Sequence, residues 1–248
     1  MNSIVQSSQY ASTTKSVGAP AYEFLVRDIV YQNVGGIDRL ARLYQPAGNG
    51  PFPAVLQIHG GAWNNKDRTD GQSIALDLAA NGIVVLSIDF RNAPEAPYPA
   101  SLADINLGVR WLKANARQFG SSPDRVGALG TSSGGHQALL TAIRPNDPRY
   151  RALALSCSPE IDAKLAFVIC GWGVMCPYDR YHLAKSRNLT NLIKSHETFF
   201  KDEAEQREAT PHLIIERGED VYLPPALQFQ GTQDQFTSVE QAEHLAKV

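Results

Sequence analysis

The 248 residues carry 23 Lys and Arg against 25 Asp and Glu, a net charge of −2, and 43% of them are hydrophobic. This composition is that of a globular protein and gives no basic surface for nucleic acid or an anionic membrane. The apolar runs are too short to span a bilayer, and the first residues do not have the pattern of a secretory signal. Three cysteines without regular spacing argue against a disulfide framework or a zinc site. We therefore expect a cytoplasmic protein without metal, nucleic acid or membrane partners.

The first part of the chain predicts an arm and a hairpin. Residues 1–20 are rich in Ser, Thr and Gln, so we expect a flexible N-terminal arm. Strands are predicted over 22–31 and 38–44, with Gly35-Gly36 as the turn between them. A buried strand over 54–58 follows.

The next part alternates helix and strand. Residues 70–81 predict a helix, and the continuous apolar run 83–88 predicts a strand of a sheet covered on both faces. A longer helix begins near Ser101 and ends at Gly120, with Ser101 and Asp104 resembling a capping box at its start. Its apolar residues recur at spacings of three or four: Leu102, Ile105, Val109, Leu112, Ala116 and Phe119.

The second half continues this alternation. Strands are predicted over 125–129, 165–170 and 226–230, and helices over 137–142 and 239–246. The highly charged segment 176–212 predicts a helical, cap-like insertion over the site. Because strands and helices alternate, we expect one α/β domain over 21–248, with a mostly parallel sheet and helices on both faces.

The most informative motif is Gly130-Thr131-Ser132-Ser133-Gly134, which lies between a predicted strand and a predicted helix. A G-x-S-x-G pattern in this context forms a tight turn that presents its serine at a helix N-terminus. The following amide and the helix dipole both favour developing negative charge there. The motif predicts that Ser132 is a nucleophile and that the Ser133 amide donates to an oxyanion.

A second motif, His59-Gly60-Gly61-Ala62-Trp63, directly follows the predicted strand over 54–58. Two adjacent glycines allow the backbone to turn so that its amides point into a shared cavity. We expect the amides of Gly60, Gly61 and Ala62 to complete the oxyanion hole with Ser133.

The segment 89–100, D-F-R-N-A-P-E-A-P-Y-P-A, adds a third motif. With all three in this order, the chain resembles the hormone-sensitive-lipase-like branch of the α/β-hydrolase carboxylesterases, from about residue 20 onward and most weakly over 143–212. Departures are mild, since Ala62 replaces a third glycine and Phe90 and Tyr98 replace other aromatic residues. The resemblance implies the α/β-hydrolase fold, a Ser-Asp-His triad and no cofactor. It assigns structural bracing near the site to Arg91, Pro94, Glu95 and Asp104.

The acid of the triad is expected after a later strand. Asp234 lies just past the predicted strand over 226–230, at the carboxyl edge where open α/β sheets place their sites. The resemblance implies the same position, through G-x-x-D. Glu219 and Asp220 are weaker alternatives, because no strand immediately precedes them.

The base of the triad has no obvious residue. A serine hydroxyl needs a base to take its proton, and the resembling family places that histidine beyond one further strand. Here only the predicted helix over 239–246 follows Asp234. His136 lies one turn after Ser132 and is expected to pack in the core, while His182 and His212 stay open as substitutes. We therefore expect that the final strand and helix are missing, that the chain is truncated before the catalytic histidine, and that turnover in this form is much reduced.

These motifs predict a serine carboxylesterase that hydrolyses short- to medium-chain acyl esters of small molecules through an acyl-enzyme intermediate. Trp63, Tyr98 and Trp172 are candidates for lining its pocket. Arylformamidases carry a similar H-G-G-x-W loop, so formamide hydrolysis stays an alternative, as do esters of plant cell-wall polysaccharides. A third alternative is a non-catalytic ligand-binding protein, as in plant hormone receptors that resemble this family. The sequence also leaves a homodimer open.

Overall fold

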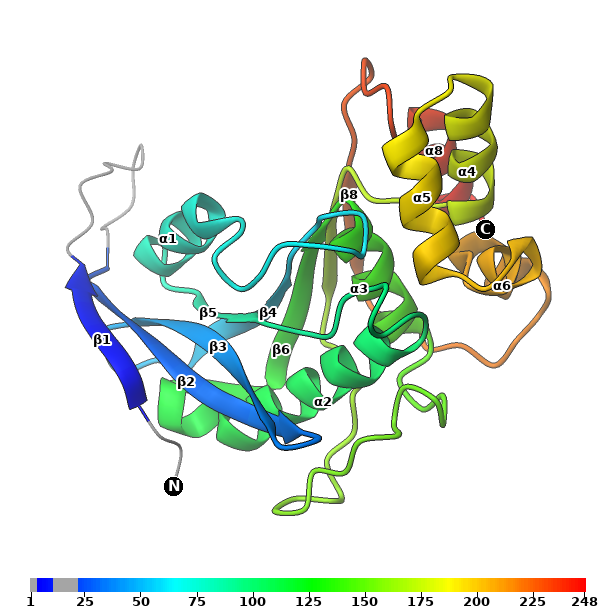
Figure 1. Cartoon of the computed structure of the whole chain (residues 1–248). Coiled ribbons are helices and arrows are strands. Elements are labelled where there is room, and N and C mark those ends of the chain that lie inside the picture. Colours follow the sequence, from blue (N-terminus) through cyan, green and yellow to red (C-terminus); the bar gives the residue numbers. More distant parts are fainter. Residues whose placement is uncertain (1–3, 11–21) are drawn as a thin grey trace.

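A computed structural model of the protein describes residues 4–10 and 22–248. Within these residues one sheet of eight strands has the order β1-β2-β3-β5-β4-β6-β7-β8 (Figure 1). The strands are β1 Ile4–Tyr10, β2 Phe24–Val34, β3 Ile37–Pro46, β4 Phe52–Ile58, β5 Val84–Ile88, β6 Ser121–Thr131, β7 Val168–Gly171 and β8 Ala226–Phe229. From β1 through β3 to β5 the neighbours are antiparallel, and from β5 to β8 they are parallel. The expected mostly parallel α/β sheet is confirmed.

Helices cover both faces of this sheet. They are α1 Gln72–Ala80, α2 Ala100–Asn115, α3 Ser133–Ile143, α4 Pro177–Ser186, α5 Thr190–Phe199, α6 Glu203–Glu208, α7 Pro211–Glu216 and α8 Val239–Leu245, with a 3₁₀ turn at Ala116–Phe119. Side chains alternate along a strand, so Val55 of β4 packs under α1 while Leu56 packs under α2 and α3. No helix among the described residues is long and apolar enough to cross a membrane.

The N-terminal arm differs in part from the expectation of a flexible segment. Ile4–Tyr10 forms β1, which pairs antiparallel with β2 and so extends the sheet by one strand. The rest of the predicted arm lies outside the described residues. The partner is the next strand along the chain, with Tyr10 opposite Phe24, and the polar composition of the predicted arm does not reveal this pairing.

The predicted capping box at the start of the second helix is wrong. Helix α2 begins at Ala100, and no side chain caps it. Asp104 is instead fully buried and accepts hydrogen bonds from the backbone amide, Nε and Nη2 of Arg91, at 2.8, 2.9 and 2.9 Å. The carboxylate therefore fixes the loop after β5, which is the bracing that the resemblance implied.

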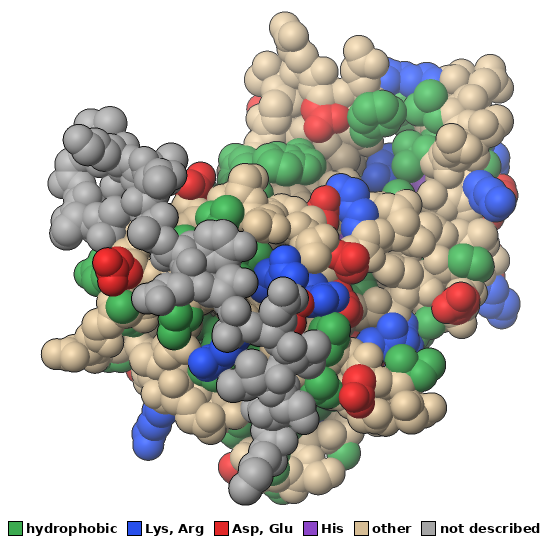
Figure 2. Space-filling model, turned by 60° about the vertical axis from the view of Figure 1, so that its left-hand side comes forward, with side chains coloured by type: hydrophobic (Ala, Val, Ile, Leu, Met, Phe, Trp, Pro, Cys, Tyr) green, Lys and Arg blue, Asp and Glu red, His purple; other side chains and the backbone are tan. Residues whose placement is uncertain are grey.

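Opposite charges are interspersed on the surface. Figure 2 shows Lys, Arg, Asp and Glu side chains side by side on the face that it draws. Arg68, for example, donates to Asp28 at 2.8 Å and to Asp89 at 3.0 Å. This arrangement agrees with the near-neutral composition and gives that face no extended field of one sign.

The charged insertion folds into the four helices α4 to α7, which run past the predicted boundary at residue 212. Figure 1 shows α4, α5 and α6 grouped beside α3, with α8 behind α4. The indole of Trp63, from the loop after β4, joins this group to the body of the domain. It is 1% exposed and stacks on Phe199 at the end of α5, with ring centroids 5.0 Å apart.

Trp63 also contacts two polar side chains, those of His136 and Arg180. Its Nε1 donates to Nδ1 of His136 on α3 at 3.3 Å, and Nε2 of the same histidine donates to the carbonyl of Ala209 at 2.7 Å. The guanidinium of Arg180 from α4 lies over the indole, 4.6 Å from the ring centroid. The expected packing role of His136 is confirmed, since its side chain is fully buried and joins the loop, α3 and the insertion.

The turn between β6 and α3 packs unusually closely. A Cβ on Gly130 would lie 2.2 Å from the carbonyl oxygen of Gly134, and one on Gly134 would lie 2.2 Å from that of Ile58 and 2.4 Å from that of His59. These atoms belong to backbone, which cannot move aside as a flexible side chain does. Glycine at both positions therefore sets how closely α3 approaches the ends of β4 and β6.

We expect the protein to become less stable as the pH falls, because of His136. Burial lowers the pKa of His136 to about 4, from an ordinary value of 6.5. The unfolded chain then takes up a proton between these two pH values that the folded chain does not, so the free energy of unfolding decreases as pH falls through this window. From pH 7 to pH 5 we expect His136 alone to contribute about 1–2 kcal/mol to this loss, measured by urea unfolding as the difference between the wild type and a variant that lacks the histidine.

His136→Gln keeps a donor and an acceptor and should make this pH dependence shallower. His182 is exposed and pairs with Glu203 at 3.1 Å, so His182→Gln is the matched control and should keep the original slope. An equally steep fall in the His136→Gln variant would contradict the assignment.

The glycine packing gives a second prediction. Gly134→Ala should lower the free energy of unfolding by at least about 2 kcal/mol, or prevent folding, because the new methyl group overlaps two carbonyl oxygens. Gly231→Ala is the control, since nothing lies within 4 Å of its Cβ position, and it should change stability by less than about 1 kcal/mol. Equal urea midpoints for the two variants would show that the turn yields more easily than its geometry indicates.

Candidate active site at the carboxyl edge of the sheet

Four neighbouring strands end side by side and place the predicted site residues at one edge. The register pairs Ile58 of β4 with Gly130 of β6, Thr131 with Gly171 of β7, and Gly171 with Phe229 of β8. The predicted oxyanion loop, Ser132 and the Asp234 turn each follow one of these strand ends. The parallel sheet thus gathers segments that lie far apart in the sequence, as ligand sites of open α/β sheets require.

Ser132 has the backbone geometry that the motif predicts. Its φ is 54° and its ψ is −123°, a conformation that L-residues rarely adopt, and it caps the N-terminus of α3. Neighbours fix the backbone on both sides: the amide donates to the Gly171 carbonyl at 2.9 Å, and the carbonyl accepts from Val174 at 3.2 Å. Within the described part of the chain, Oγ makes no hydrogen bond. A strained, partly exposed serine is thereby held with its hydroxyl free.

The loop after β4 runs directly past this serine. A Cβ on Gly60 would lie 3.3 Å from Cβ of Ser132, which shows how closely the two segments approach. Gly61, Ala62 and Trp63 have positive φ angles of 100°, 51° and 65°, so the backbone turns over three successive residues. The loop therefore curves sharply where it passes Ser132.

The amides at the site are not all equivalent. The Trp63 amide donates to Oγ of Ser133 at 3.2 Å, so it holds the loop against α3 and is not free for a ligand. Among the described residues, no hydrogen bond occupies the amides of Gly61 and Ala62. The Ser133 amide lies in the first turn of α3, where amides have no partner within the helix. The role of Gly60, Gly61, Ala62 and Ser133 as an oxyanion hole stays a prediction.

Asp234 lies in the turn after β8 and is partly buried. Partial burial acts to raise its pKa, but the amides of Phe236 and Thr237, which donate to Oδ1 at 2.8 and 3.1 Å, hold that pKa below its ordinary value. The carboxylate is therefore ionised at neutral pH and fixed by its own turn. Its assignment as the triad acid stays a prediction.

The two competing acids occupy different surroundings. Glu219 forms ion pairs with Arg144 and Arg217. Arg144 follows the last residue of α3, whereas Ser132 precedes the first, so the two ends are about 16 Å apart. Asp220 follows directly along the chain. Both acids therefore belong to the far end of α3.

None of the six histidines, all of which the structure describes, hydrogen-bonds to Ser132 or Asp234. His59 is buried, stacks on Phe90 and contacts the Gly60 carbonyl through Nδ1 at 2.8 Å. His182 pairs with Glu203, and His212 lies beside His244, so the substitutes left open by the sequence do not contact the serine. The base stays unassigned, and the expected truncation stays a prediction.

The three candidate pocket residues differ in exposure. Trp63 is buried, and Tyr98 is 6% exposed, with its hydroxyl donating to Glu208 at 2.8 Å. Trp172 is 41% exposed and directly follows β7, at the same edge as Ser132. In this conformation only Trp172 offers a ligand a substantial apolar surface, and the pocket assignment stays a prediction for all three.

Sequence reasoning missed Arg180, which it counted among the charged residues of the insertion. The side chain is 3% exposed, Nε donates to His196 at 3.0 Å, and burial lowers its pKa to about 9. The carboxylate of Asp234 acts in the opposite direction on this pKa, so the two charges influence one another across the site. No local pattern distinguishes this arginine from its exposed neighbours.

Comparison with known proteins agrees with this architecture. The model of the BD-FAE family matches residues 42–248. Esterase LipC of Mycobacterium tuberculosis is 31% identical over 188 residues, which are 70% of this chain and 46% of LipC. Isoprenylcysteine alpha-carbonyl methylesterase ICME of Arabidopsis thaliana is 26% identical over 196 residues, 77% of this chain and 45% of ICME. The chain thus spans less than half the length of these two relatives.

Solved structures show the same fold. Esterase B from Lactobacillus rhamnosis superposes with a TM-score of 0.71 at 24% identity, covering 90% of this chain and 70% of its own. An acetyl ester-xyloside bifunctional hydrolase from Caldicellulosiruptor lactoaceticus gives 0.71 at 16% identity, with 94% and 82% covered. The chain therefore belongs to the BD-FAE family and has the α/β-hydrolase fold that its resemblance to the hormone-sensitive-lipase-like carboxylesterases implied.

Proposed function

We propose that this protein is a serine esterase in which Ser132 attacks the carbonyl carbon of a carboxylic ester. The observation that carries the proposal is the backbone of Ser132, held in a strained conformation at the N-terminus of α3 by hydrogen bonds on both sides. Such strain persists only where the surroundings fix it, and it marks functional sites more often than ordinary turns. The names of the relatives, esterases and carboxylic ester hydrolases, support the same activity.

The proposed reaction has two halves. Oγ of Ser132 forms a bond to the acyl carbon, and the amides of Ser133, Gly61 and Ala62 stabilise the negative charge that develops on the carbonyl oxygen. Collapse of the tetrahedral intermediate breaks the bond to the alcohol, which leaves with a proton, and water then releases the acid from the acyl-enzyme. Asp234 would orient a histidine that moves these protons.

Short acyl esters of small molecules are the substrates that we favour. Within the described residues, the indole of Trp172 is the one large exposed side chain among the predicted pocket residues, which provides a modest apolar surface. Two structural neighbours are complexes of a Thermogutta terrifontis esterase with propionate and with butyrate. Esters of cell-wall polysaccharides and formamides stay as alternatives, and so does a protein that binds such ligands without cleaving them.

We expect a fluorophosphonate probe to label the protein at Ser132, because labelling depends on both the nucleophile and the oxyanion donors. Ser132→Ala should abolish the label, detected by in-gel fluorescence and by mass spectrometry of the modified peptide. Ser186→Ala removes an exposed serine and is the control that should label like the wild type.

Labelling should be slow, because no described histidine contacts the hydroxyl. Without its base a serine hydrolase keeps roughly 10³–10⁴-fold acceleration over water, through binding and oxyanion stabilisation. Tight ligand binding without labelling would favour the binding-protein alternative, and equal labelling of the Ser132→Ala variant would refute the proposed nucleophile.

We expect p-nitrophenyl acetate and butyrate to be hydrolysed at least about tenfold more efficiently than the decanoate, in kcat/KM, since the difference of about 1.4 kcal/mol is within what pocket fit supplies. Release of p-nitrophenolate measures all three. Acetylated xylan and N-formylkynurenine, assayed beside them with the Ser132→Ala variant as the blank, test the alternative substrates. Preference for either of these, or for the decanoate, would overturn the assignment to short acyl esters.

A further inference from the structure

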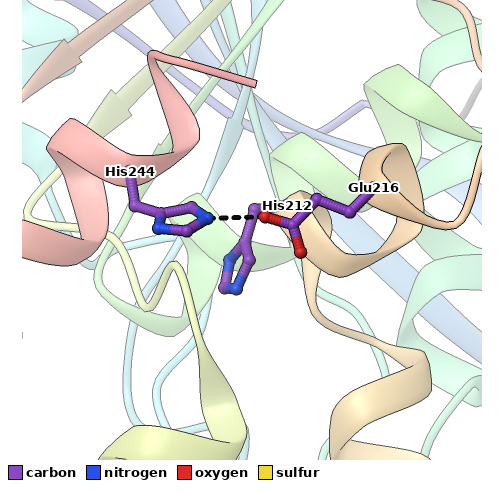
Figure 3. Close-up of side chains that lie close together, drawn as sticks. All are labelled: His212, Glu216 and His244. Carbon is purple, nitrogen blue, oxygen red and sulfur yellow. Dashed lines mark hydrogen bonds and ion pairs between the residues drawn. The ribbon is translucent and has the colours of Figure 1, made fainter.

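Two histidines and a glutamate meet where α7 and α8 pack together, away from the residues assigned to ester hydrolysis. His212 and Glu216 are four residues apart on α7 and so share one face, and His244 comes from α8 (Figure 3). One nitrogen or oxygen atom from each of the three side chains lies within 4.8 Å of those of the other two. We propose that these three residues bind a zinc-type divalent metal ion that joins α7 to α8.

His212 is the side chain whose lack of a hydrogen-bond partner points to a ligand. It is 8% exposed, its Nδ1 is buried without a hydrogen-bond partner, and neither of its ring nitrogens pairs with any described residue. Glu216 and His244 pair with one another, with Nε2 of His244 2.6 Å from Oε1 of Glu216, and this pair does not include His212. The His212 and His244 rings lie 4.6 Å apart between centroids, so a cation held between them would pair with the imidazole that lacks a partner.

The distances are compatible with a metal. Zinc binds histidine nitrogen and carboxylate oxygen at about 2.0–2.2 Å, which in a tetrahedral site separates the ligand atoms by roughly 3.3 Å. The present atoms lie up to 4.8 Å apart, and the closest pair lies at 2.6 Å. Glu216 and His244 are exposed, so their side chains have room to rotate towards tetrahedral geometry around an ion.

The types of ligand atom limit which metal ions this site can bind. Imidazole together with one carboxylate suits Zn²⁺ and Co²⁺, whereas Mg²⁺ and Ca²⁺ prefer oxygen ligands alone. Metal binding also needs neutral imidazole and ionised carboxylate. Burial, followed by the neighbouring His244, lowers the pKa of His212, and the hydrogen bond from His244 lowers that of Glu216, so both groups are in the required state at neutral pH.

Such an ion would connect the two sides of the proposed site. Helix α7 packs on α3, which begins after Ser132, and α8 follows the turn that holds Asp234. A metal at the α7–α8 contact would hold α8 against the insertion and limit the movement of the segment after Asp234. Its role would be structural, since none of its ligands contacts the nucleophile.

The test is Co²⁺ binding to protein stripped of metal with a chelator. We expect one equivalent to produce the visible absorption of a tetrahedral or five-coordinate site, and Zn²⁺ to displace it. Glu216→Gln and His244→Gln should each weaken binding at least tenfold, because loss of a direct ligand costs no less than the 10–100-fold seen for outer contacts. Zn²⁺ at the same concentration should raise the melting temperature of the wild type more than that of His244→Gln.

Two controls keep the test decisive. His182→Gln removes an exposed histidine that also pairs with a glutamate, Glu203, and it should bind Co²⁺ like the wild type. Ser132→Ala should bind equally well, so the outcome does not depend on the proposed esterase activity. His212→Gln, at the most buried ligand, is interpreted only if its circular dichroism matches the wild type. Absence of the Co²⁺ absorption, or binding that survives in both His244→Gln and Glu216→Gln, would overturn the proposal.

Discussion

The close approach of the first turn of α3 to the ends of β4 and β6 is the constraint on which the rest of the site depends. No Cβ fits at Gly130 or Gly134, since backbone oxygens already occupy those positions. Because the backbones are in contact there, the serine between the two glycines is held at the N-terminus of α3, and the loop after β4 passes close to it. The position of the proposed nucleophile is thus set by backbone packing before any side chain is considered.

A second layer of contacts fixes the loop that faces the serine. Trp63 is enclosed by Phe199, Arg180 and His136, which come from α5, α4 and α3, so the loop cannot shift without disturbing the insertion. Burial makes both the cation and the imidazole costly to charge, and their contacts compensate only in part. The insertion helices α4 and α5 are therefore coupled to the loop beside Ser132 through this tryptophan.

Much of the fold and the candidate site is predictable from sequence, because both depend on local patterns. The alternation of strands and helices is a short-range signal, and so is a serine flanked by glycines between a predicted strand and a predicted helix. What escaped prediction depends on partners distant in sequence. Asp104 has the spacing of a cap but pairs with Arg91, and Arg180 has the polarity of a surface residue but lies on an indole. His212 and His244 meet across 32 positions, a separation that no spacing rule anticipates.

The strained backbone at Ser132 costs stability for the sake of the proposed activity. A residue other than glycine held at this φ costs of order 1–3 kcal/mol, a large share of the margin by which proteins stay folded. Ser132→Gly would relieve that cost at once, so mutation under selection for folding alone would drift toward glycine here. The proposed nucleophilic role of the Ser132 hydroxyl is the benefit that would offset this standing penalty on the fold.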